Sequence, residues 1–281
     1  MIPKDSKIYQ TLEELVLSSS VLVISGLPGV GKSLYVNQAL VIAKKKYKAT
    51  SVIQWDVARK AFETDELSQL FPMGDGVVHN GVKLSAGLWL INVVSDWIKN
   101  HNPESDFLLI EAPLVGHRFI ELMQIQKDDD IESFMASDSM KVVVPIPSIE
   151  VRIKIEADRK AQVEEEASSW MGAKPSVMLL IWKELCELAN DLGKDINVDS
   201  QPPYDPKIYE FVFQRVLKNR HFIPLFINEI YELTIRDENE LHDTDSLVAS
   251  PETAKSIALK IVSQFLDLNQ IDTVVEHWYK T

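Results

Sequence analysis

The sequence contains a single cysteine, Cys186, and no long apolar run. One thiol allows neither a disulfide within the chain nor a zinc site built from cysteines. The strongest apolar stretch, Val21–Ser25, is far shorter than the roughly 20 residues needed to cross a bilayer. The first ten residues also lack the apolar segment of a signal peptide. These absences predict a cytoplasmic protein without a membrane span.

Glycine and proline are also sparse, at 10 and 13 of 281 residues. This excludes collagen-like and low-complexity chains. Apolar residues make up 46% and charged residues 25%, which is an ordinary globular composition. The length suits one large α/β domain or two small domains.

The chain has 29 basic and 42 acidic residues, so its net charge is −13. Most of the acidic excess lies after residue 100. Proteins that wrap nucleic acid usually present a basic surface, because neutralising phosphates supplies most of the affinity. The balance therefore predicts no extended nucleic-acid binding, although a short basic cleft is compatible with it.

Short apolar runs alternate with longer segments of helical pattern. The predicted strands are 21–25, 50–55, 107–111, 141–146 and 222–231. The predicted helices are 34–46, 58–70, 84–99, 116–125, 149–166, 177–192, 207–219, 251–268 and 271–279. The segments 127–138, 193–206 and 236–245 are predicted loops. Strands that are apolar on both faces and alternate with helices indicate a mostly parallel sheet covered on both sides.

The segment that follows the first strand, Gly26-x-x-x-x-Gly31-Lys32-Ser33, matches the Walker A pattern. Its glycines let backbone N–H groups point at phosphate oxygens, the lysine reaches the β- and γ-phosphates, and the serine hydroxyl binds Mg²⁺. ATP is therefore the expected cofactor, with GTP as the alternative. The residues predicted to hold the nucleotide are Gly26, Leu27, Pro28, Gly29, Val30, Gly31, Lys32, Ser33 and Leu34. A glycine-rich turn with a chance Lys-Ser pair is the structural alternative.

The second strand ends in Asp56, and Arg59 follows one helical turn later. Ligand sites of parallel sheets lie at the carboxyl ends of the strands. Asp56 is therefore a candidate to accept the proton of an attacking hydroxyl, and Arg59 a candidate to hold an anion. A helix-capping aspartate with a local arginine partner is the alternative.

The third strand ends in Glu111, where P-loop proteins place the carboxylate that orients water on Mg²⁺. Ser33 and Glu111 are the predicted metal residues, with a strand-capping glutamate as the alternative.

Arg152 and Arg159 lie two helical turns apart after the fourth strand, so both point to one face. Such a pair can neutralise charge on a transferring phosphoryl group. A solvated helix carrying the ion pairs Glu150–Lys154, Arg152–Glu156 and Glu156–Lys160 is an equal alternative.

The loop before the long helix carries Asp75, His79 and Asn80. These side chains are candidates to contact an acceptor. A polar loop with a helix cap is the favoured interpretation.

With these motifs, residues 18–165 resemble P-loop kinases of the group that includes the kinase domain of polynucleotide kinase, zeta toxin and chloramphenicol phosphotransferase. The resemblance implies that Asp56 acts as the base, that Arg59 assists it, and that Arg152 and Arg159 belong to a lid. The chain departs from the pattern in Gln54-Trp55 before the aspartate, in the Glu-Ala-Pro end of the third strand, and in the helical segment 167–220.

The expected fold is therefore an α/β P-loop NTPase three-layer sandwich with a mostly parallel five-stranded sheet and a helical insertion. Its expected parts are a nucleotide-binding core (1–166), the insertion (167–220) and a last strand with C-terminal helices (221–281). The expected activity is Mg²⁺- and ATP-dependent transfer of the γ-phosphoryl group to a hydroxyl of a small molecule or nucleotide, through Lys32, Asp56, Arg59, Arg152 and Arg159. The alternatives are an ATPase switch that binds a protein partner through its C-terminal helices, a 5′-hydroxyl polynucleotide kinase, and nucleotide binding without catalysis.

Overall fold

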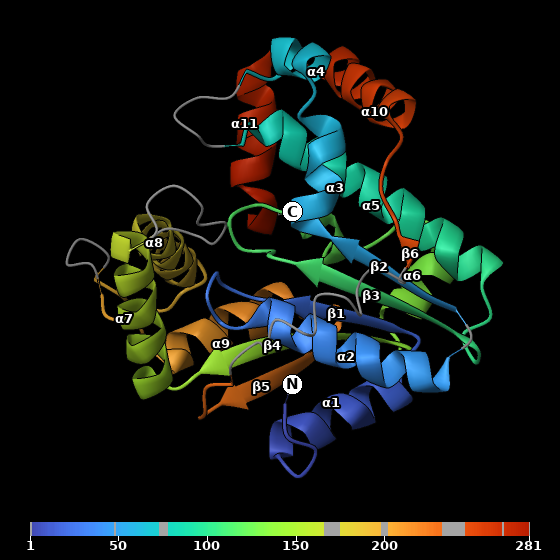
Figure 1. Cartoon of the computed structure of the whole chain (residues 1–281). Coiled ribbons are helices and arrows are strands. Elements are labelled where there is room, and N and C mark those ends of the chain that lie inside the picture. Colours follow the sequence, from blue (N-terminus) through green and yellow to red (C-terminus); the bar gives the residue numbers. More distant parts are fainter. Residues whose placement is uncertain are drawn as a thin grey trace.

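A parallel six-stranded sheet organises the computed structural model of the chain (Figure 1). The structure describes residues 2–47, 49–72, 78–165, 175–197, 202–231, 245–265 and 267–280. Its strands are β1 (Val21–Ser25), β2 (Ala49–Gln54), β3 (Asp106–Ala112), β4 (Met140–Pro147), β5 (His221–Ile227) and β6 (Asp245–Ser246). They lie in the order β5-β4-β1-β3-β2-β6, and every neighbouring pair is parallel. All carboxyl ends therefore meet at one edge, with β1 near the middle.

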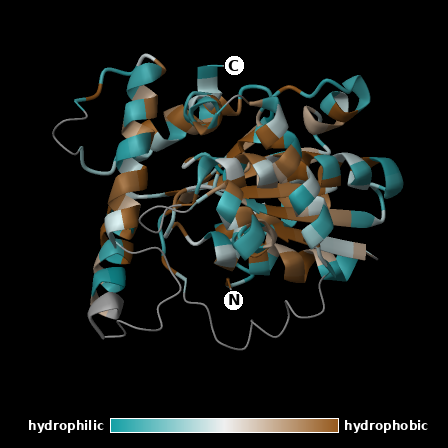
Figure 2. Cartoon of the chain, turned by 90° about the horizontal axis from the view of Figure 1, so that it is seen from above, coloured by the Kyte–Doolittle hydropathy of each residue, from teal (hydrophilic) through white to brown (hydrophobic). Residues whose placement is uncertain are grey.

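The central strands are buried on both faces, which explains their unbroken apolar sequences. In β1, Val21 and Val23 join one hydrophobic core, whereas Leu22 and Ile24 join the other. The alternation follows from the two-residue period of a strand. In Figure 2 the strands form the hydrophobic interior, and the helices around them turn hydrophilic faces outward.

Helices cover both faces of the sheet and complete a three-layer α/β sandwich (Figure 1). On one face, α1 (Lys7–Leu17) packs on α2 (Lys32–Lys46). On the other face, α5 (Asn80–Asn100) packs against α10 (Pro251–Gln264) and α11 (Leu268–Glu276). This arrangement confirms the predicted fold class, with six strands in place of five.

Three further helices lie near the carboxyl end of β4 (Figure 1). They are α7 (Ile149–Glu165), α8 (Pro175–Asp191) and α9 (Pro206–Val216). The last two fall in the predicted insertion, and their buried residues, among them Trp182, Tyr209 and Phe213, join the same hydrophobic core as α5 and β1.

Two predicted elements are wrong. The helix expected at 116–125 is a loop followed by the 3-10 turn η2 (Ile120–Leu122), because Pro113, Gly116 and the left-handed Leu114, His117 and Phe119 bend the backbone out of helical geometry. The loop expected at 127–138 contains α6 (Asp129–Met135), whose amino end is capped by Asp128.

Other boundaries differ from the predictions. The helix expected at 58–70 is the 3-10 turn η1 (Arg59–Phe62) and α4 (Asp65–Leu70), the latter capped by Thr64. The short helix α3 (Trp55–Ala58) precedes them. The expected helix at 271–279 is α11 followed by the 3-10 turn η5 (Trp278–Lys280). His79 caps α5, as the favoured interpretation predicted, and Asp75 lies outside the described residues.

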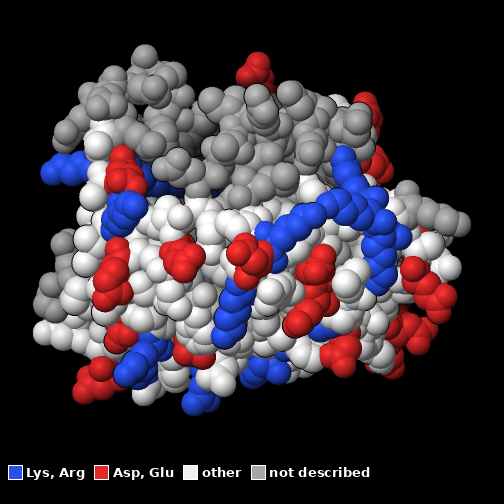
Figure 3. Space-filling model, turned by 60° about the horizontal axis from the view of Figure 1, so that its bottom comes forward, with Lys and Arg blue, Asp and Glu red and all other residues white. Residues whose placement is uncertain are grey.

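The described helices include none with the length and apolarity that a bilayer crossing requires. On the face shown in Figure 3, basic and acidic side chains are interspersed.

Candidate functional site

The Walker A segment forms the turn between β1 and α2 at the carboxyl edge of the sheet. Gly26 and Gly31 have φ values of +138° and +86°, which a residue with a Cβ rarely adopts. Gly31 is also the N-cap of α2 and provides no side chain to its first N–H groups. These donors and the positive end of the helix dipole form an anion site.

Tyr209 of α9 holds the start of this loop. Its hydroxyl accepts a hydrogen bond of 2.8 Å from the backbone N–H of Leu27. A Cβ on Gly26 would lie 2.4 Å from the same hydroxyl oxygen, so only glycine fits there. The segment predicted as an insertion therefore supports the phosphate loop directly.

Lys32 turns its ammonium group back toward the loop. The Nζ atom donates to the carbonyl oxygens of Gly26, at 2.8 Å, and Leu27, at 3.0 Å. Burial lowers the pKa of Lys32 to about 8, against the opposing effect of the Glu111 and Asp56 carboxylates. A lysine that follows the loop and turns its ammonium back over the loop is placed to bind the outer phosphates of a nucleotide.

Ser33 and Glu111 meet across the top of the sheet. The Ser33 hydroxyl donates to Glu111 Oε1 at 3.5 Å, because β3 lies beside β1 and ends next to the loop. The amide of Gln54, at the end of β2, donates to Glu111 Oε2 at 3.0 Å and orients the carboxylate. A hydroxyl and a carboxylate oxygen at this separation fit Mg²⁺, which binds few protein oxygens and keeps several waters.

Asp56 and Arg59 lie together beyond the end of β2. Arg59 Nε lies 3.4 Å from Asp56 Oδ1, and the guanidinium also pairs with Glu63. The Asp56 side chain is 84% exposed, and the N-cap of α3 is Gln54. Asp56 is therefore accessible at the carboxyl edge. The alternative interpretation predicted the Arg59–Asp56 pair but neither the pair with Glu63 nor Gln54 as the cap.

Arg152 and Arg159 both reach the phosphate loop from α7. Arg152 is 2% exposed. It donates from Nε to Glu156 Oε1 at 2.6 Å and from Nη1 to the Pro28 carbonyl at 3.2 Å. Arg159 Nε lies 3.4 Å from the place that a Cβ on Gly29 would occupy. Of the three ion pairs predicted along this helix, the structure records Arg152–Glu156.

Arg118 was not predicted as a site residue, yet the loop after β3 brings it near enough for the Asp56 charge to act on it. Its guanidinium lies 5.5 Å from the centre of the Trp55 ring. Burial lowers the pKa of Arg118, and the Asp56 carboxylate opposes the shift. The Nε atom is buried without a hydrogen-bond partner. The signal available in the sequence was Pro113 and Gly116, which mark a loop at the carboxyl edge.

A second charged group lies next to Arg118. Burial and then Arg118 lower the pKa of Lys83 on α5, whereas Glu184 of α8 raises it. Burial lowers the pKa of His117 to about 3, so this ring is neutral at physiological pH. Its Nδ1–H donates to the Val275 carbonyl at 2.9 Å. Lys83 of α5, Glu184 of α8 and Arg118 of the loop after β3 therefore form a group of charges that act on one another.

No protein-family model matches the chain, and no curated protein matches it. Among solved structures, the chain is similar to one from a study titled as the molecular and structural characterization of the PezAT chromosomal toxin-antitoxin system of the human pathogen Streptococcus pneumoniae. The identity is 14%, the TM-score is 0.32, and the match covers 92% of this chain and 98% of that chain. A likeness this loose has no bearing on the function.

Proposed function

We propose that the protein is a Mg²⁺-dependent phosphotransferase that moves the γ-phosphoryl group of ATP to a hydroxyl of a small molecule or nucleotide. The observation that carries the proposal is the Ser33–Glu111 contact of 3.5 Å beside the Walker A lysine. A phosphate cradle, a metal-binding pair and a cation at the outer phosphates are the parts that phosphoryl transfer requires.

In the proposed reaction, the acceptor hydroxyl lies between Asp56 and the γ-phosphorus. Its oxygen forms the new bond to phosphorus, the bond from phosphorus to the ADP oxygen breaks, and the proton passes to the Asp56 carboxylate. Mg²⁺ held by Ser33 and Glu111 would offset charge on the phosphate oxygens. When the nucleotide binds, the Lys32 ammonium gives up its hydrogen bonds to the Gly26 and Leu27 carbonyls and binds the β- and γ-phosphates.

Four arginines have proposed roles. Arg159 approaches the loop at Gly29 and offsets charge that develops on the phosphoryl group. Arg152, buried and bound to the Pro28 carbonyl, holds α7 against the loop. Arg59 forms an ion pair with Asp56, and the charge of Arg118 acts on the same carboxylate, so both arginines help to position the proposed base.

Phosphorus NMR tests the proposal directly. The protein is incubated with ATP and Mg²⁺, alone and with pools of nucleosides, sugars, antibiotics and a 5′-hydroxyl oligonucleotide. We expect a new phosphoester resonance that disappears in Lys32→Ala. Lys45→Ala, an exposed lysine at the other end of α2, is the matched control and should retain it.

The alternative functions give different spectra. If inorganic phosphate is the only product and its amount depends on Lys32, the proposal of a kinase is replaced by that of an ATPase switch that acts on a protein partner. Binding of ATP without any turnover would leave a nucleotide-binding protein. Phosphorylation of the oligonucleotide alone would identify a polynucleotide kinase.

A further inference from the structure

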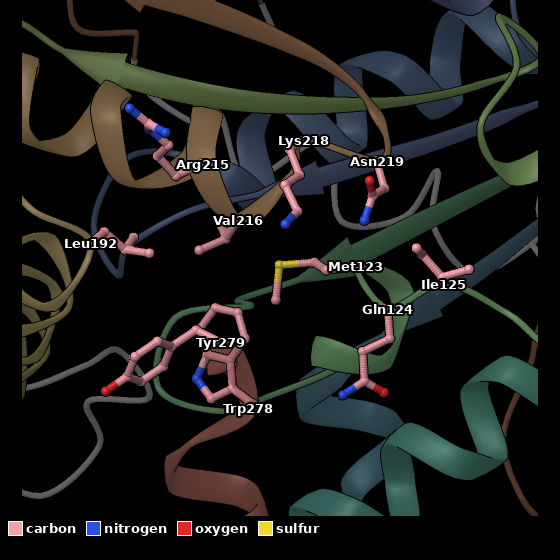
Figure 4. Close-up of a pocket in the computed structure, with 10 residues that line it drawn as sticks. All are labelled: Met123, Gln124, Ile125, Leu192, Arg215, Val216, Lys218, Asn219, Trp278 and Tyr279. Atoms are coloured by element: carbon pink, nitrogen blue, oxygen red, sulfur yellow. The ribbon is translucent and has the colours of Figure 1, made fainter. Parts of the chain in front are cut away.

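A pocket of about 650 Å³ lies away from the phosphate loop, among segments that the proposed reaction does not use (Figure 4). Its walls are residues 123–125 after η2, Leu192 after α8, Trp278 with Tyr279 in η5, and four residues at and after the end of α9, namely Arg215, Val216, Lys218 and Asn219. This volume lies within the range of small-molecule sites.

A buried arginine fixes two of these walls to one another. Arg220 donates from Nε to the Leu122 carbonyl at 2.6 Å, and from Nη2 to the Gln124 carbonyl. Its Nη1 donates to Glu132 Oε1 at 2.7 Å, and Glu132 Oε2 accepts from the Gln126 backbone N–H at 2.8 Å. The side chain of Arg220 is fully buried. The turn that follows α9 and the segment after η2 are therefore held at a fixed separation, and the pocket is formed before any ligand arrives.

An aromatic pair forms the opposite wall. The rings of Trp278 and Tyr279 are nearly perpendicular, at 86°, with centres 5.8 Å apart. The Tyr279 hydroxyl donates to the Asp191 carboxylate, which fixes that ring. Met123, only 4% exposed, provides a polarizable side chain between the two walls. Aromatic rings and a thioether suit a flat aromatic ligand.

The charges that line the pocket are positive, although the chain carries a net charge of −13. The Arg215 guanidinium lies 5.4 Å from the centre of the Phe211 ring and turns away from Met123 in Figure 4. Lys218 forms no ion pair within the described part of the chain. Figure 4 shows its ammonium and the Asn219 amide directed toward Met123. These donors are placed to bind an anionic group.

We infer that this pocket binds a planar aromatic anion, with its ring against Trp278, Tyr279 and Met123 and its negative group at Lys218 and Asn219. The site is separate from the proposed phosphotransferase site, so either proposal stands or falls without the other.

The test uses the full chain with 2-naphthoate as the probe. 2-Naphthamide, which has nearly the same shape and no charge, is the matched ligand control, and 2-naphthyl phosphate distinguishes a phosphate from a carboxylate preference. Binding is followed by NMR of ¹³C-methyl methionine, with the Met123 signal assigned from Met123→Leu. We expect 2-naphthoate to shift the Met123 methyl through its ring current, and to bind at least about tenfold more tightly than the amide.

Variants of Lys218 test whether the carboxylate of 2-naphthoate binds at this residue. Lys218→Glu should weaken 2-naphthoate binding at least about tenfold. Lys207→Glu, the same change at the exposed opposite end of α9, should not. Lys218→Met tests the loss of charge without its reversal, and circular dichroism verifies that each variant is folded.

Four outcomes would overturn the inference. They are an unmoved Met123 signal at millimolar probe, equal affinity for acid and amide, equal effects of Lys218→Glu and Lys207→Glu, and displacement of the probe by ATP with Mg²⁺. The last would assign the anion to the phosphate loop.

Discussion

The hydroxyl of Tyr209 accepts a hydrogen bond from the backbone N–H of Leu27, 182 positions earlier in the chain. Leu27 lies in the phosphate loop, and Tyr209 lies near the start of α9, fully buried. Burial raises the pKa of this phenol well above its usual range, so it stays protonated. A helix from the C-terminal half therefore fixes the backbone of a loop from the N-terminal third.

Replacing Tyr209 with Phe should weaken both the fold and the phosphate loop. The Leu27 N–H would be left buried without a partner, at a cost of about 1–3 kcal/mol in unfolding free energy. ATP affinity, measured by calorimetry, should also fall. Tyr47→Phe is the control, because the Tyr47 hydroxyl donates to the carbonyls of Val16 and Ser19, remote from the loop. An equal loss of ATP affinity in both variants would contradict the role given to Tyr209.

Removing the charge of Glu111 should raise the Mg²⁺ concentration needed for turnover. Glu111→Gln removes the ligand itself. Gln54→Leu removes only the group that orients it and should cost roughly 10–100-fold in Mg²⁺ affinity. The measurement is a Mg²⁺ titration of ATP turnover. Asp106→Asn, at the other end of β3, should leave the titration unchanged, and an unchanged midpoint in Glu111→Gln would remove this residue from the metal site.

Asp56→Asn should bind ATP normally and transfer phosphate about 10²–10⁴-fold more slowly, the usual contribution of a general base. Single-turnover kinetics with the identified acceptor, beside ATP binding by calorimetry, separates the two effects. Asp65→Asn, in the first turn of the nearby α4, is the matched control. Full transfer by Asp56→Asn would exclude Asp56 as the base.

Glu121 in η2 should make stability depend on pH. Its carboxylate packs against Gly87 of α5, with Oε2 buried and unpaired. Burial raises its pKa from 4.5 to about 8. Between these values the folded state keeps a proton that the unfolded state has lost. The contribution of Glu121 to the free energy of unfolding therefore falls as pH rises, by at most about 1.4 kcal/mol per pH unit. Above about pH 8 this contribution no longer changes.

Denaturant titrations at pH 5, 6, 7 and 8 measure this slope. Glu121→Gln keeps the shape of the side chain and carries no proton to lose, so its slope should be shallower than that of the wild type. Identical slopes would show that Glu121 is ionised throughout.

Four of the strands were predictable to within one residue at each end. β1, β3 and β4 are buried on both faces, and this burial requires the apolar runs visible in the sequence, whereas β2 is buried only at Ser51, Val52 and Ile53. β6 was not predictable, because Asp245 and Ser246 are polar and exposed and form a strand only through pairing with β2. α1 was missed although its signals were present. Ser6 caps it, and Leu12, Leu15 and Val16 lie at helical spacing.

The parts of the candidate site that come from contiguous residues or from the ends of recognisable strands were predictable. The Walker A residues are contiguous, and Asp56 and Glu111 end strands that are apolar enough to locate. Tyr209, Arg118 and Gln54 reach the site through the folded backbone, and no spacing in the sequence connects them to the loop. The bend at 113–119 that positions Arg118 depends on tertiary contacts, among them the His117–Val275 hydrogen bond.

The strand order has a consequence for synthesis on the ribosome. The four inner strands, β4, β1, β3 and β2, come from residues 21–147, whereas both outer strands, β5 and β6, come from residues 221–246. At about 5–20 residues per second, the nascent chain spends on the order of seconds with its inner strands made and their outer partners not yet synthesised. Two unpaired strand edges are exposed during that interval, which is the condition for misassociation between chains.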